Sequence, residues 1–420
     1  MSGFASTAIF IESRRSSTAL SEHVSAESQI VKHTSALISI VLSLLLTSLV
    51  AAPSFAAQAD EKPSVPCPTL TPLHGLLPIL IWLGILPRPV MASTIAPSDS
   101  STSIVIRPDP NDQITCGKTV ITAIDDIAFA RRSLPTGKSM DLLLDVQMPQ
   151  SPGKKPLVVY VTGGGFIRAP KEAALNLRTY VAEAGFVVAS VQYRTITDGA
   201  NYRDGVADVK SAIRYLRANA DRYGIDPSKV AVWGESAGGY IAAMVGVTNG
   251  VKIFDIGNNL DQRSDVQAVI DKFGASDTSK LSADFDSRTR DANNAKDNPI
   301  AQYIGLDPIS HLLDTRVAMT AANPLTYLKA GAPPFLIFHG SQDRLVSPNQ
   351  TLILHKALVA AGANSTRYVL EGAGHGDLSF LGDTKAGLPW STNQTMRIIV
   401  DFLDHWISVV GTPARDHRTP

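Results

Sequence analysis

The chain has 420 residues, a formal net charge of zero and 44% hydrophobic residues, a composition typical of a soluble globular protein. The balanced charge gives no electrostatic support for binding nucleic acid or an anionic surface, so neither partner is expected. Cys67 and Cys116 are the only two cysteines, and neither has the spacing of a metal ligand. We expect no metal and no cofactor, and the sequence leaves open whether the cysteines pair.

Residues 1–57 are predicted to be a leader with a secretory signal peptide. An apolar run extends from Ala36 to Ala52, after Lys32 and before Ser54-Phe55-Ala56, which has small residues where a signal peptidase cuts. The pattern predicts a secreted or periplasmic protein. A buried core helix and a membrane anchor are the alternatives, although the run is short for a membrane span.

A second apolar segment, residues 73–91, is interrupted or bounded by prolines. It is a candidate for membrane contact or anchoring, for a second export-like segment, or for a piece packed on the domain, and these alternatives stay open. Residues 93–112, rich in Ser, Pro and Asp, are predicted to be a linker. We therefore expect 58–114 to be an apolar segment and a linker, followed by a folded domain over 115–410.

The folded domain alternates between apolar strands and helices. Strands that are apolar on both faces and alternate with helices predict an α/β protein with a mostly parallel sheet covered on both sides. Such sheets place their chemistry beyond the carboxyl ends of the strands. The strands are expected at 140–146, 156–161, 186–191, 229–233, 266–270, 334–338 and 366–370, and the helices at 172–184, 202–221, 239–245, 348–361 and 393–408.

Residues 275–322 break this alternation with a polar, irregular stretch. An insertion of this length at the carboxyl ends of a parallel sheet is usually functional or disordered. We expect it to form a cap over the site, and a mobile surface loop is the alternative.

Residues 234–238 read Gly-Glu-Ser-Ala-Gly and match the pattern G-x-S-x-G. A predicted strand precedes them and a predicted helix follows, which is the context of a nucleophile elbow. The small neighbours would let Ser236 sit on a strained turn. The alternative is a glycine-rich turn in which the serine has no chemical role.

Two later loops offer an acid and a base for Ser236. A serine hydroxyl needs a histidine within hydrogen-bond reach, and that histidine needs an orienting carboxylate. Asp343 follows the strand at 334–338, and His375 lies between glycines after the strand at 366–370. The order serine, acid, histidine is the one that this architecture requires. Of the other histidines nearby, His339 is expected to be structural and His355 to be solvated.

An oxyanion that develops at the site needs donors that are already in place. One is expected to be the backbone amide of Ala237, directly after the nucleophile. The other is expected from Gly164 or Gly165, after the strand at 156–161. The alternative, a phosphate-binding loop, lacks the spacing and the lysine of a Walker loop.

At this point the chain resembles the α/β-hydrolases of the esterase and lipase type. The nearest groups are the hormone-sensitive-lipase-like and the bacterial feruloyl or acetylxylan esterase-like branch. The resemblance implies an α/β-hydrolase fold with a cap-like insertion, a triad of Ser236, Asp343 and His375, and an oxyanion hole at Gly164, Gly165 and Ala237. The matching segments are 163–166, 193–194, 208–216, 223–227, 234–239, 323–325, 333–343 and 372–376.

The chain departs from that family at two positions. Thr162 stands where relatives often have a histidine before the glycine run, and Arg344 stands where a small residue or proline often follows the acid. Arg194 and Asp208 match the family and are expected to form a structural ion pair. Candidates for lining the acyl or alcohol pocket are Phe166, Phe380 and Trp390, with ordinary packing as the alternative for each.

These patterns predict a serine carboxylic-ester hydrolase that acts through an acyl-enzyme on small or medium acyl esters, either small molecules or groups linked to a polymer. A serine peptidase or amidase on the same scaffold is one alternative. A hydrolase-like binding protein without catalysis is another, although such proteins typically lose the serine or the histidine. Nothing in the sequence indicates the oligomeric state.

Overall fold

The computed structural model describes residues 65–69, 90–293, 295, 298–305, 316–378 and 383–408. The chain divides into two units, Met1–Glu61 and Lys62–Pro420, and every described residue belongs to the second. The predicted leader, residues 73–89 of the second apolar segment, and Phe380 therefore lie outside the described residues. Among the helices of the described part, none is long and apolar enough to cross a membrane.

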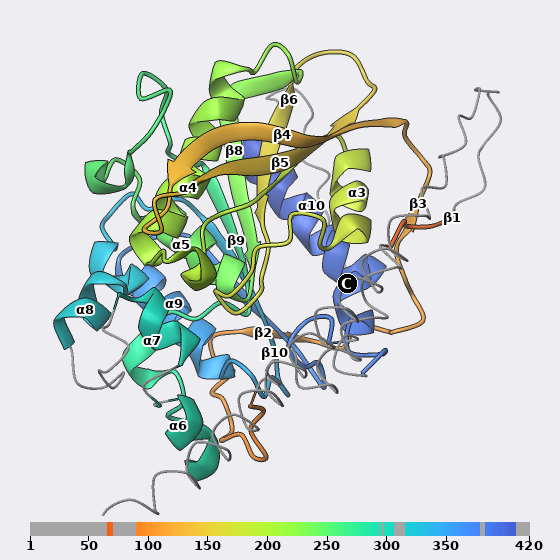
Figure 1. Ribbon diagram of the computed structural model, residues 1–420. Coiled ribbons are helices and arrows are strands. Elements are labelled where there is room, and N and C mark those ends of the chain that lie inside the picture. Colours follow the sequence, from red (N-terminus) through yellow and green to blue (C-terminus); the bar gives the residue numbers. More distant parts are fainter. Residues whose placement is uncertain are drawn as a thin grey trace, which may run out of the picture. The chain divides into compact units, whose positions relative to one another are not determined.

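A nine-stranded sheet forms the centre of the second unit (Figure 1). The strand order is β2-β11-β10-β9-β8-β6-β7-β5-β4, with parallel pairing from β2 to β7 and antiparallel pairing of β5 and β4 at one edge. The mostly parallel sheet expected from the sequence is confirmed. Its strands are β2 (Ile104–Ile106), β4 (Ile121–Ser133), β5 (Ser139–Pro149), β6 (Lys155–Val161), β7 (Val187–Val191), β8 (Ile225–Glu235), β9 (Ala268–Lys272), β10 (Phe335–Gly340) and β11 (Ser365–Leu370).

Helices cover both faces of this sheet because its central strands are apolar on both sides. In β6, Val159 packs into one core and Tyr160 into the other. The first core receives side chains from α4 (Tyr202–Ala218), α5 (Ala237–Val247) and α9 (Pro348–Ala360). The second receives them from α3 (Leu175–Glu183) and α10 (Asn393–Ile407), which lie on the opposite side (Figure 1).

The segment before residue 115 is part of this fold, which differs from the expectation of a linker. Strand β2 pairs in parallel with β11, with Ile104 opposite Tyr368. Its three residues are all β-branched, a composition that favours strands, but they are too few to stand out within a stretch rich in Ser, Pro and Asp. The folded sheet therefore begins near residue 104, and residues 93–112 are not a free linker.

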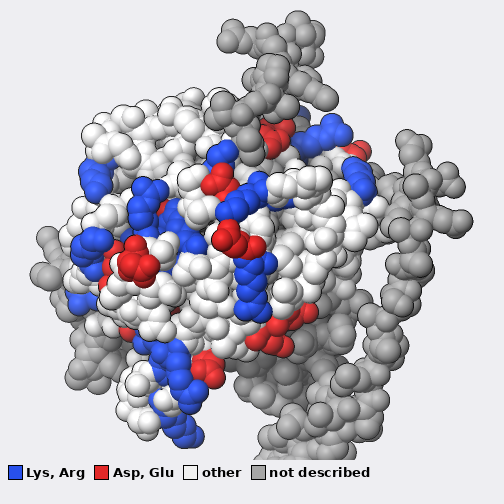
Figure 2. Space-filling model, turned by 90° about the horizontal axis from the view of Figure 1, so that it is seen from above, with Lys and Arg blue, Asp and Glu red and all other residues white. Residues whose placement is uncertain are grey.

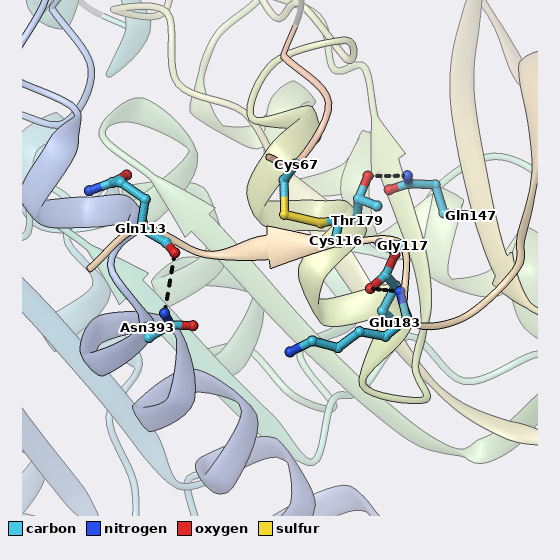
Figure 3. Close-up of a disulfide and its surroundings, with 9 residues drawn as sticks. Cys67, Gln113, Cys116, Gly117, Gln147, Thr179, Glu183 and Asn393 are labelled. Carbon is cyan, nitrogen blue, oxygen red and sulfur yellow. Dashed lines mark hydrogen bonds between the residues drawn. A yellow bond between two sulfur atoms is a disulfide. The ribbon is translucent and has the colours of Figure 1, made fainter. Parts of the chain in front are cut away.

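The two cysteines form a disulfide in a small separate sheet (Figure 3). Strand β1 (Val65–Pro66) pairs antiparallel with β3 (Thr115–Cys116), and Cys67 bonds to Cys116. Next to this bridge, the amide of Gly117 donates to the Glu183 carboxylate at the end of α3, at 2.6 Å. The question that the sequence left open is thus answered by pairing, and the bridge lies against α3.

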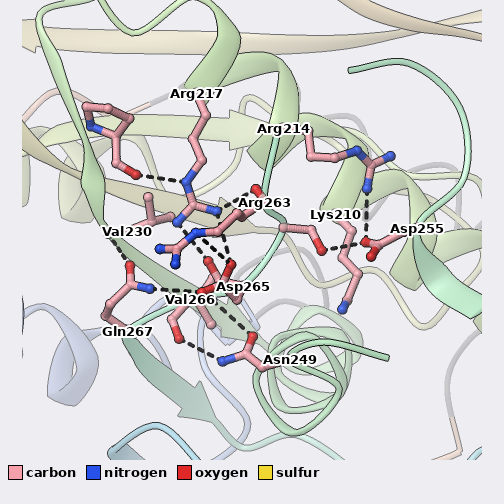
Figure 4. A network of polar contacts seen from close by, with 12 residues as sticks. Lys210, Arg214, Arg217, Val230, Asn249, Asp255, Arg263, Asp265, Val266 and Gln267 are labelled. Atoms are coloured by element: carbon pink, nitrogen blue, oxygen red, sulfur yellow. Dashed lines mark hydrogen bonds and ion pairs between the residues drawn. The ribbon is translucent and has the colours of Figure 1, made fainter. Parts of the chain in front are cut away.

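Basic residues of α4 hold the long connection between α5 and β9 (Figure 4). Arg217 donates to the backbone oxygen of Asp265 at 2.8 Å, and Arg214 pairs with Asp255 at 3.2 Å. Lys210 donates to the backbone oxygen of Thr248 at 2.7 Å, and burial lowers its pKa to about 8. The elbow lies where α5 begins and beside the end of β9. The network holds the opposite ends of these two elements, the end of α5 and the start of β9.

The expected ion pair of Arg194 with Asp208 is also present. Arg194 Nε lies 2.8 Å from Asp208 Oδ2, and Arg132 Nε lies 2.9 Å from the other oxygen of the same buried carboxylate. Two guanidinium groups on one buried aspartate join β4 and the end of β7 to α4.

The insertion contains three short helices in its described part: α6 (Ser287–Asn293), α7 (Pro299–Tyr303) and α8 (Arg316–Ala321). Side chains of α7 and Met319 of α8 are buried in the first core. These contacts pack the insertion against the main domain. On the face seen in Figure 2, acidic and basic side chains are intermingled, in keeping with the balanced charge.

Candidate active site

Ser236 occupies a strained turn between β8 and α5. Its φ and ψ are 56° and −119°, values that non-glycine residues rarely adopt. The two glycines of the motif have no room for a side chain. A Cβ on Gly234 would lie 2.0 Å from the carbonyl oxygen of Gly238, and one on Gly238 would lie 2.0 Å from that of Val161. The turn is fixed from below, because Ser236 N donates to the backbone oxygen of Lys272 at 2.9 Å.

Asp343 lies in the loop after β10 and is fully buried. Its Oδ1 accepts hydrogen bonds from the amides of Leu345 and Val346, each at 2.9 Å. Burial by itself would raise the pKa of this carboxyl group. Electrostatic attraction to His375 and the hydrogen bonds from His339 and His375 outweigh burial and hold the pKa of this carboxyl group well below its ordinary value. The group is therefore a carboxylate at neutral pH.

His375 lies in the loop after β11 and connects the acid with the serine. Its Nδ1 lies 2.6 Å from Asp343 Oδ2, and its Nε2 lies 2.7 Å from Ser236 Oγ. Because Nδ1 faces a carboxylate, it carries a proton, which leaves Nε2 able to accept the serine proton. The ring of Phe273 packs against the imidazole at 4.7 Å between ring centres. The structure thus brings together the three residues that the sequence singled out.

The glycine run 163–165 lies directly beside the elbow. A Cβ on Gly163 would be 3.1 Å from Cβ of Ser236, so a side chain at this position would crowd the nucleophile elbow. Gly164 and Gly165 have φ values of 144° and 63°, and the oxygen of Gly164 accepts from the amide of Ile167 at 3.1 Å to close the turn. On the other side of the serine, Ala237 is the first residue of α5, where an amide has no partner within the helix.

Thr162, at the position of the absent histidine, is held by a residue that the sequence analysis did not single out for this purpose. The hydroxyl of Tyr193, just after β7, donates to the backbone oxygen of Thr162 at 3.0 Å. Both residues are buried. Tyr193 therefore anchors the start of the glycine run. The sequence signal was a tyrosine directly after a buried strand, which is common in cores and does not by itself indicate this role.

The aromatic candidates for the pocket are packed in the interior. Phe166 is 5% exposed and stacks on Tyr303 of α7 at 4.1 Å between ring centres. Trp390 is 2% exposed and meets the edge of Phe273 at 4.7 Å. The ordinary-packing alternative therefore describes both rings in this structure. They act on the site through the residues they support, since Phe273 contacts His375 and Phe166 follows the glycine run.

Two further side chains near the site were not expected there. Lys272, at the end of β9, is buried, and its Nζ lies 2.6 Å from Glu235 Oε1 beside the nucleophile. His339, expected to be structural, is buried with its Nε2 3.1 Å from Asp343 Oδ2. A charged or titratable residue at the end of an apolar strand was the signal for each, but the sequence could not show what the side chain faces.

The expectation for His355 was wrong. Its side chain is buried rather than solvated, with Nδ1 2.9 Å from Ser365 Oγ and Nε2 3.0 Å from the backbone oxygen of Thr102. The reason is the segment before β2, which lies against α9 and covers it. In the described part of the chain, no group of three or more His, Cys, Asp or Glu side chains is arranged to hold a metal ion.

The fold and the arrangement of serine, histidine and carboxylate at the ends of parallel strands are those of an α/β-hydrolase of the esterase and lipase type. The chain belongs to the BD-FAE family, whose model matches residues 144–358, about half of the chain. The match includes Ser236 and Asp343 and ends before His375.

The curated relatives that the chain resembles carry esterase names. The chain is 28% identical over 285 residues to esterase LipC of Mycobacterium tuberculosis, which covers 65% of this chain and 67% of that protein. It is 29% identical over 261 residues to isoprenylcysteine alpha-carbonyl methylesterase ICME of Arabidopsis thaliana, covering 61% of this chain and 58% of that protein. The chain therefore spans between about half and two thirds of the length of these relatives.

Solved structures agree with the class. A truncated carbohydrate esterase from gut microbiota has a TM-score of 0.55 and 26% identity, covering 71% of this chain and 99% of the other. A bifunctional GH43-CE protein of Bacteroides eggerthii has a TM-score of 0.57 and 26% identity, covering 67% of this chain and 38% of the other. Esterase 2 of Thermogutta terrifontis, at 24% identity and a TM-score of 0.51, shares the fold.

Proposed function

We propose that the protein is a serine carboxylic-ester hydrolase that acts through an acyl-enzyme. The observation that carries the proposal is the continuous hydrogen-bonded chain from Ser236 Oγ through His375 to Asp343, with links of 2.7 Å and 2.6 Å. The membership in the BD-FAE family and the esterase names of the relatives support it.

Each residue has a defined step in this reaction. Ser236 Oγ attacks the ester carbonyl while His375 Nε2 takes its proton and then gives it to the leaving alcohol. Asp343 holds the imidazole in the required tautomer and stabilises its charged form. The amides of Ala237 and of Gly164 or Gly165 stabilise the oxyanion. Water, activated by the same histidine, then attacks the acyl-enzyme and releases the acid.

The proposed substrates are small or medium acyl esters, either free or linked to a polymer. One relative is named a methylesterase and one structural neighbour a carbohydrate esterase, which supports a small acyl or alcohol group on one side of the ester.

The test is hydrolysis of p-nitrophenyl esters of increasing acyl length. We expect the wild type to favour short chains and Ser236→Ala to lose at least about a thousand-fold in kcat. Ser228→Ala, an exposed serine bonded to Asp226, is the matched control and should keep full activity. Equal rates for the wild type and Ser236→Ala would remove Ser236 as the nucleophile.

The same protein samples separate the alternative chemistry. His375→Ala should be nearly as damaging as the serine change, because the triad acts as a unit. Peptide p-nitroanilides probe the amide reaction. Release of p-nitroaniline without ester turnover would favour the peptidase or amidase alternative, and no turnover of either class would favour a binding protein.

We propose further that the protein is exported. The predicted leader motivates this, and the Cys67–Cys116 bridge supports it, because disulfides persist in oxidising compartments and are rare in reducing ones. Membrane contact through residues 73–91 is part of the same proposal. Fractionation of cells that express the full chain, with a cytoplasmic marker enzyme followed in parallel, tests both. Activity that stays with the cytoplasmic marker would contradict export.

A further inference from the structure

The carboxylate of Asp343 has a second histidine on the same oxygen that faces His375. His339 Nε2 lies 3.1 Å from Asp343 Oδ2, and both side chains are completely buried. We propose that His339 is a positioning residue for the catalytic acid, and that it stands at the end of a buried chain of donors running from Arg367 through Thr351. This inference rests on the proposed function.

The carboxylate has a full set of hydrogen-bond partners. Oδ1 accepts from the amides of Leu345 and Val346, and Oδ2 accepts from His375 and His339. Two donors on each oxygen saturate the acceptor sites of a carboxylate. Three of these donors are the amides of Leu345 and Val346, in the same loop as Asp343, and the proposed catalytic base, His375. His339 is the one side chain in the set that takes no part in the proposed proton transfer.

The tautomer of His339 follows from its neighbours. Its Nε2 faces two acceptors, Asp343 Oδ2 and the backbone oxygen of Val346 at 3.0 Å, so Nε2 carries the proton. Burial lowers the pKa of His339, which keeps the ring neutral, and its Nδ1 is therefore an acceptor. The hydroxyl of Thr351 lies 2.8 Å from Nδ1, nearer than its other acceptor, the backbone oxygen of Pro348 at 3.3 Å, and donates to Nδ1.

The chain continues to a buried cation. Arg367 Nε donates to Thr351 Oγ1 at 3.0 Å, and its other nitrogens donate to Ser103 Oγ at 2.7 Å and to the backbone oxygen of Pro348 at 2.8 Å. Every link from Arg367 to Asp343 therefore has its donor directed toward the carboxylate. Aligned donors of this kind polarise one another in a medium of low dielectric.

This geometry gives His339 two effects on the proposed reaction. It fixes the rotation of the carboxylate, so that Oδ2 stays directed at His375 Nδ1. Its hydrogen bond also withdraws negative charge from Oδ2 of Asp343. The carboxylate therefore stabilises the protonated form of His375 less strongly than it would without His339. His339 itself is no base for Ser236, because its ring is fully buried and both of its nitrogens are occupied.

The charged groups around this chain are few. Arg367 faces His339 across Thr351, and His375 faces the Asp343 carboxylate from the loop after β11. On the far side of the nucleophile lies the pair of Lys272 and Glu235. The ring of Phe273 packs against His375. A change at His339 reaches Ser236 through the hydrogen bonds of Asp343 and His375.

The test compares His339→Leu, which removes the donor, with His339→Gln, whose amide nitrogen can occupy the position of Nε2. For His339→Leu we expect kcat on short p-nitrophenyl esters to fall about ten-fold with KM nearly unchanged. We also expect the acid limb of the pH profile of kcat/KM to move up by about half a pH unit. His339→Gln should restore both the rate and the limb.

A merely structural role predicts a different result. The inference is overturned if His339→Leu lowers the maximum of kcat/KM while the acid limb of its pH profile stays in place. It is also overturned if His339→Gln behaves like His339→Leu. If His339→Leu does not fold, Thr351→Val removes the donor to Nδ1 of His339 at nearly constant volume. We expect it to move the acid limb of the pH profile in the same direction. An acid limb that does not move in Thr351→Val also overturns the inference.

The far-downfield proton signal of the Asp343–His375 hydrogen bond provides a readout that needs no turnover. It is assigned by its loss in His375→Ala, and it should move in His339→Leu and stay in His339→Gln. A signal that moves in neither variant overturns the inference whatever the activity. Failure of the proposed function is seen separately, as absence of ester turnover in the wild type or its persistence in Ser236→Ala.

Discussion

Two aspartates near the elbow lie in opposite environments. Asp343 receives four hydrogen bonds and stays charged, as described above. Asp271, in β9, is fully buried, and its Oδ1 accepts one hydrogen bond, from the amide of Gly274 at 2.9 Å. Its Oδ2 has no partner among the described residues. Burial therefore raises the pKa of Asp271 to about 7, so this carboxyl group is protonated in mildly acidic solution.

Asp271→Asn should change how stability depends on pH. The folded protein holds the Asp271 proton more tightly than the unfolded chain, whose pKa is near 3.8, so ionisation lowers the free energy of unfolding as pH rises from about 4 to about 7. The full effect is on the order of 4 kcal/mol. Asparagine cannot ionise, so the variant should gain stability relative to the wild type across this range.

The measurement is the difference in Tm between the variant and the wild type at several pH values. It should rise from pH 4 to pH 7 and then level off. Asp261→Asn, at an exposed loop position, is the control and should show no such rise. A difference that is flat with pH would show that Asp271 is ionised in the folded protein throughout.

At the scale of single residues, the sequence predicted those whose position along the chain determines their role. Ser236, Asp343 and His375 each follow a buried strand, and parallel strands bring their carboxyl ends to one edge. His339 and Asp271 also lie at strand ends, but their roles depend on which way one side chain points. Periodicity carries no information on that, so the second partner of the acid and the uncharged aspartate were not predictable.

At the scale of elements, the long apolar strands and the helices between them were predictable because both faces of the sheet are buried. Two strands of the nine-stranded sheet were not. β4 has many exposed residues and lies at the antiparallel edge, where one face is solvated and the apolar signal is diluted. β2 has three residues, fewer than any pattern needs. The contacts of the insertion were also beyond prediction, because they depend on packing between segments far apart in the chain.

One of those contacts joins the insertion to the loop that contains the glycine run 163–165. Phe166, directly after the glycine run, has a φ of 62°, which is unfavourable for a bulky residue. Tyr303 of α7 stacks on its ring at an interplanar angle of 15°, and Tyr240 of α5 meets its edge. The two tyrosines hold Phe166 in this conformation, so α7 supports the loop that is expected to bind the oxyanion.

Replacing Tyr303 separates the ring from the hydroxyl. The hydroxyl is buried and has no partner among the described residues, so Tyr303→Phe should stabilise the protein by about 1 kcal/mol and leave kcat unchanged. Tyr303→Ala removes the stacking partner and should cost about 3 kcal/mol and lower kcat. Thermal unfolding and ester turnover of both variants decide this. Full activity in the alanine variant would show that α7 does not support the loop.

At the scale of the whole described unit, the segment before β4 ties distant parts together. Ala92 N donates to the backbone oxygen of Arg344, next to Asp343, at 3.0 Å. Ser93 N donates to Asp286 of the insertion at 2.8 Å. Farther along, Ser103 Oγ accepts a hydrogen bond from Arg367, the residue from which the donor chain to Asp343 starts. The segment expected to be a linker therefore contacts the acid loop, the insertion and the sheet edge.

The Cys67–Cys116 bridge sets how firmly the start of this segment is held. It closes a loop with a sequence separation of 49, for which the chain-entropy model gives about 4 kcal/mol of stabilisation. Strand β1 has only two residues, while β2 holds the segment independently at the sheet edge, so the realised effect should be smaller.

We expect Cys67→Ala/Cys116→Ala to lower Tm by several degrees. Because the bridge lies against α3 and away from the triad, kcat/KM should not change. Wild type measured in a reducing agent should lose the same amount of Tm, which separates the bond from the packing of the buried sulfurs. A double variant that loses activity at temperatures where it remains folded would contradict this expectation.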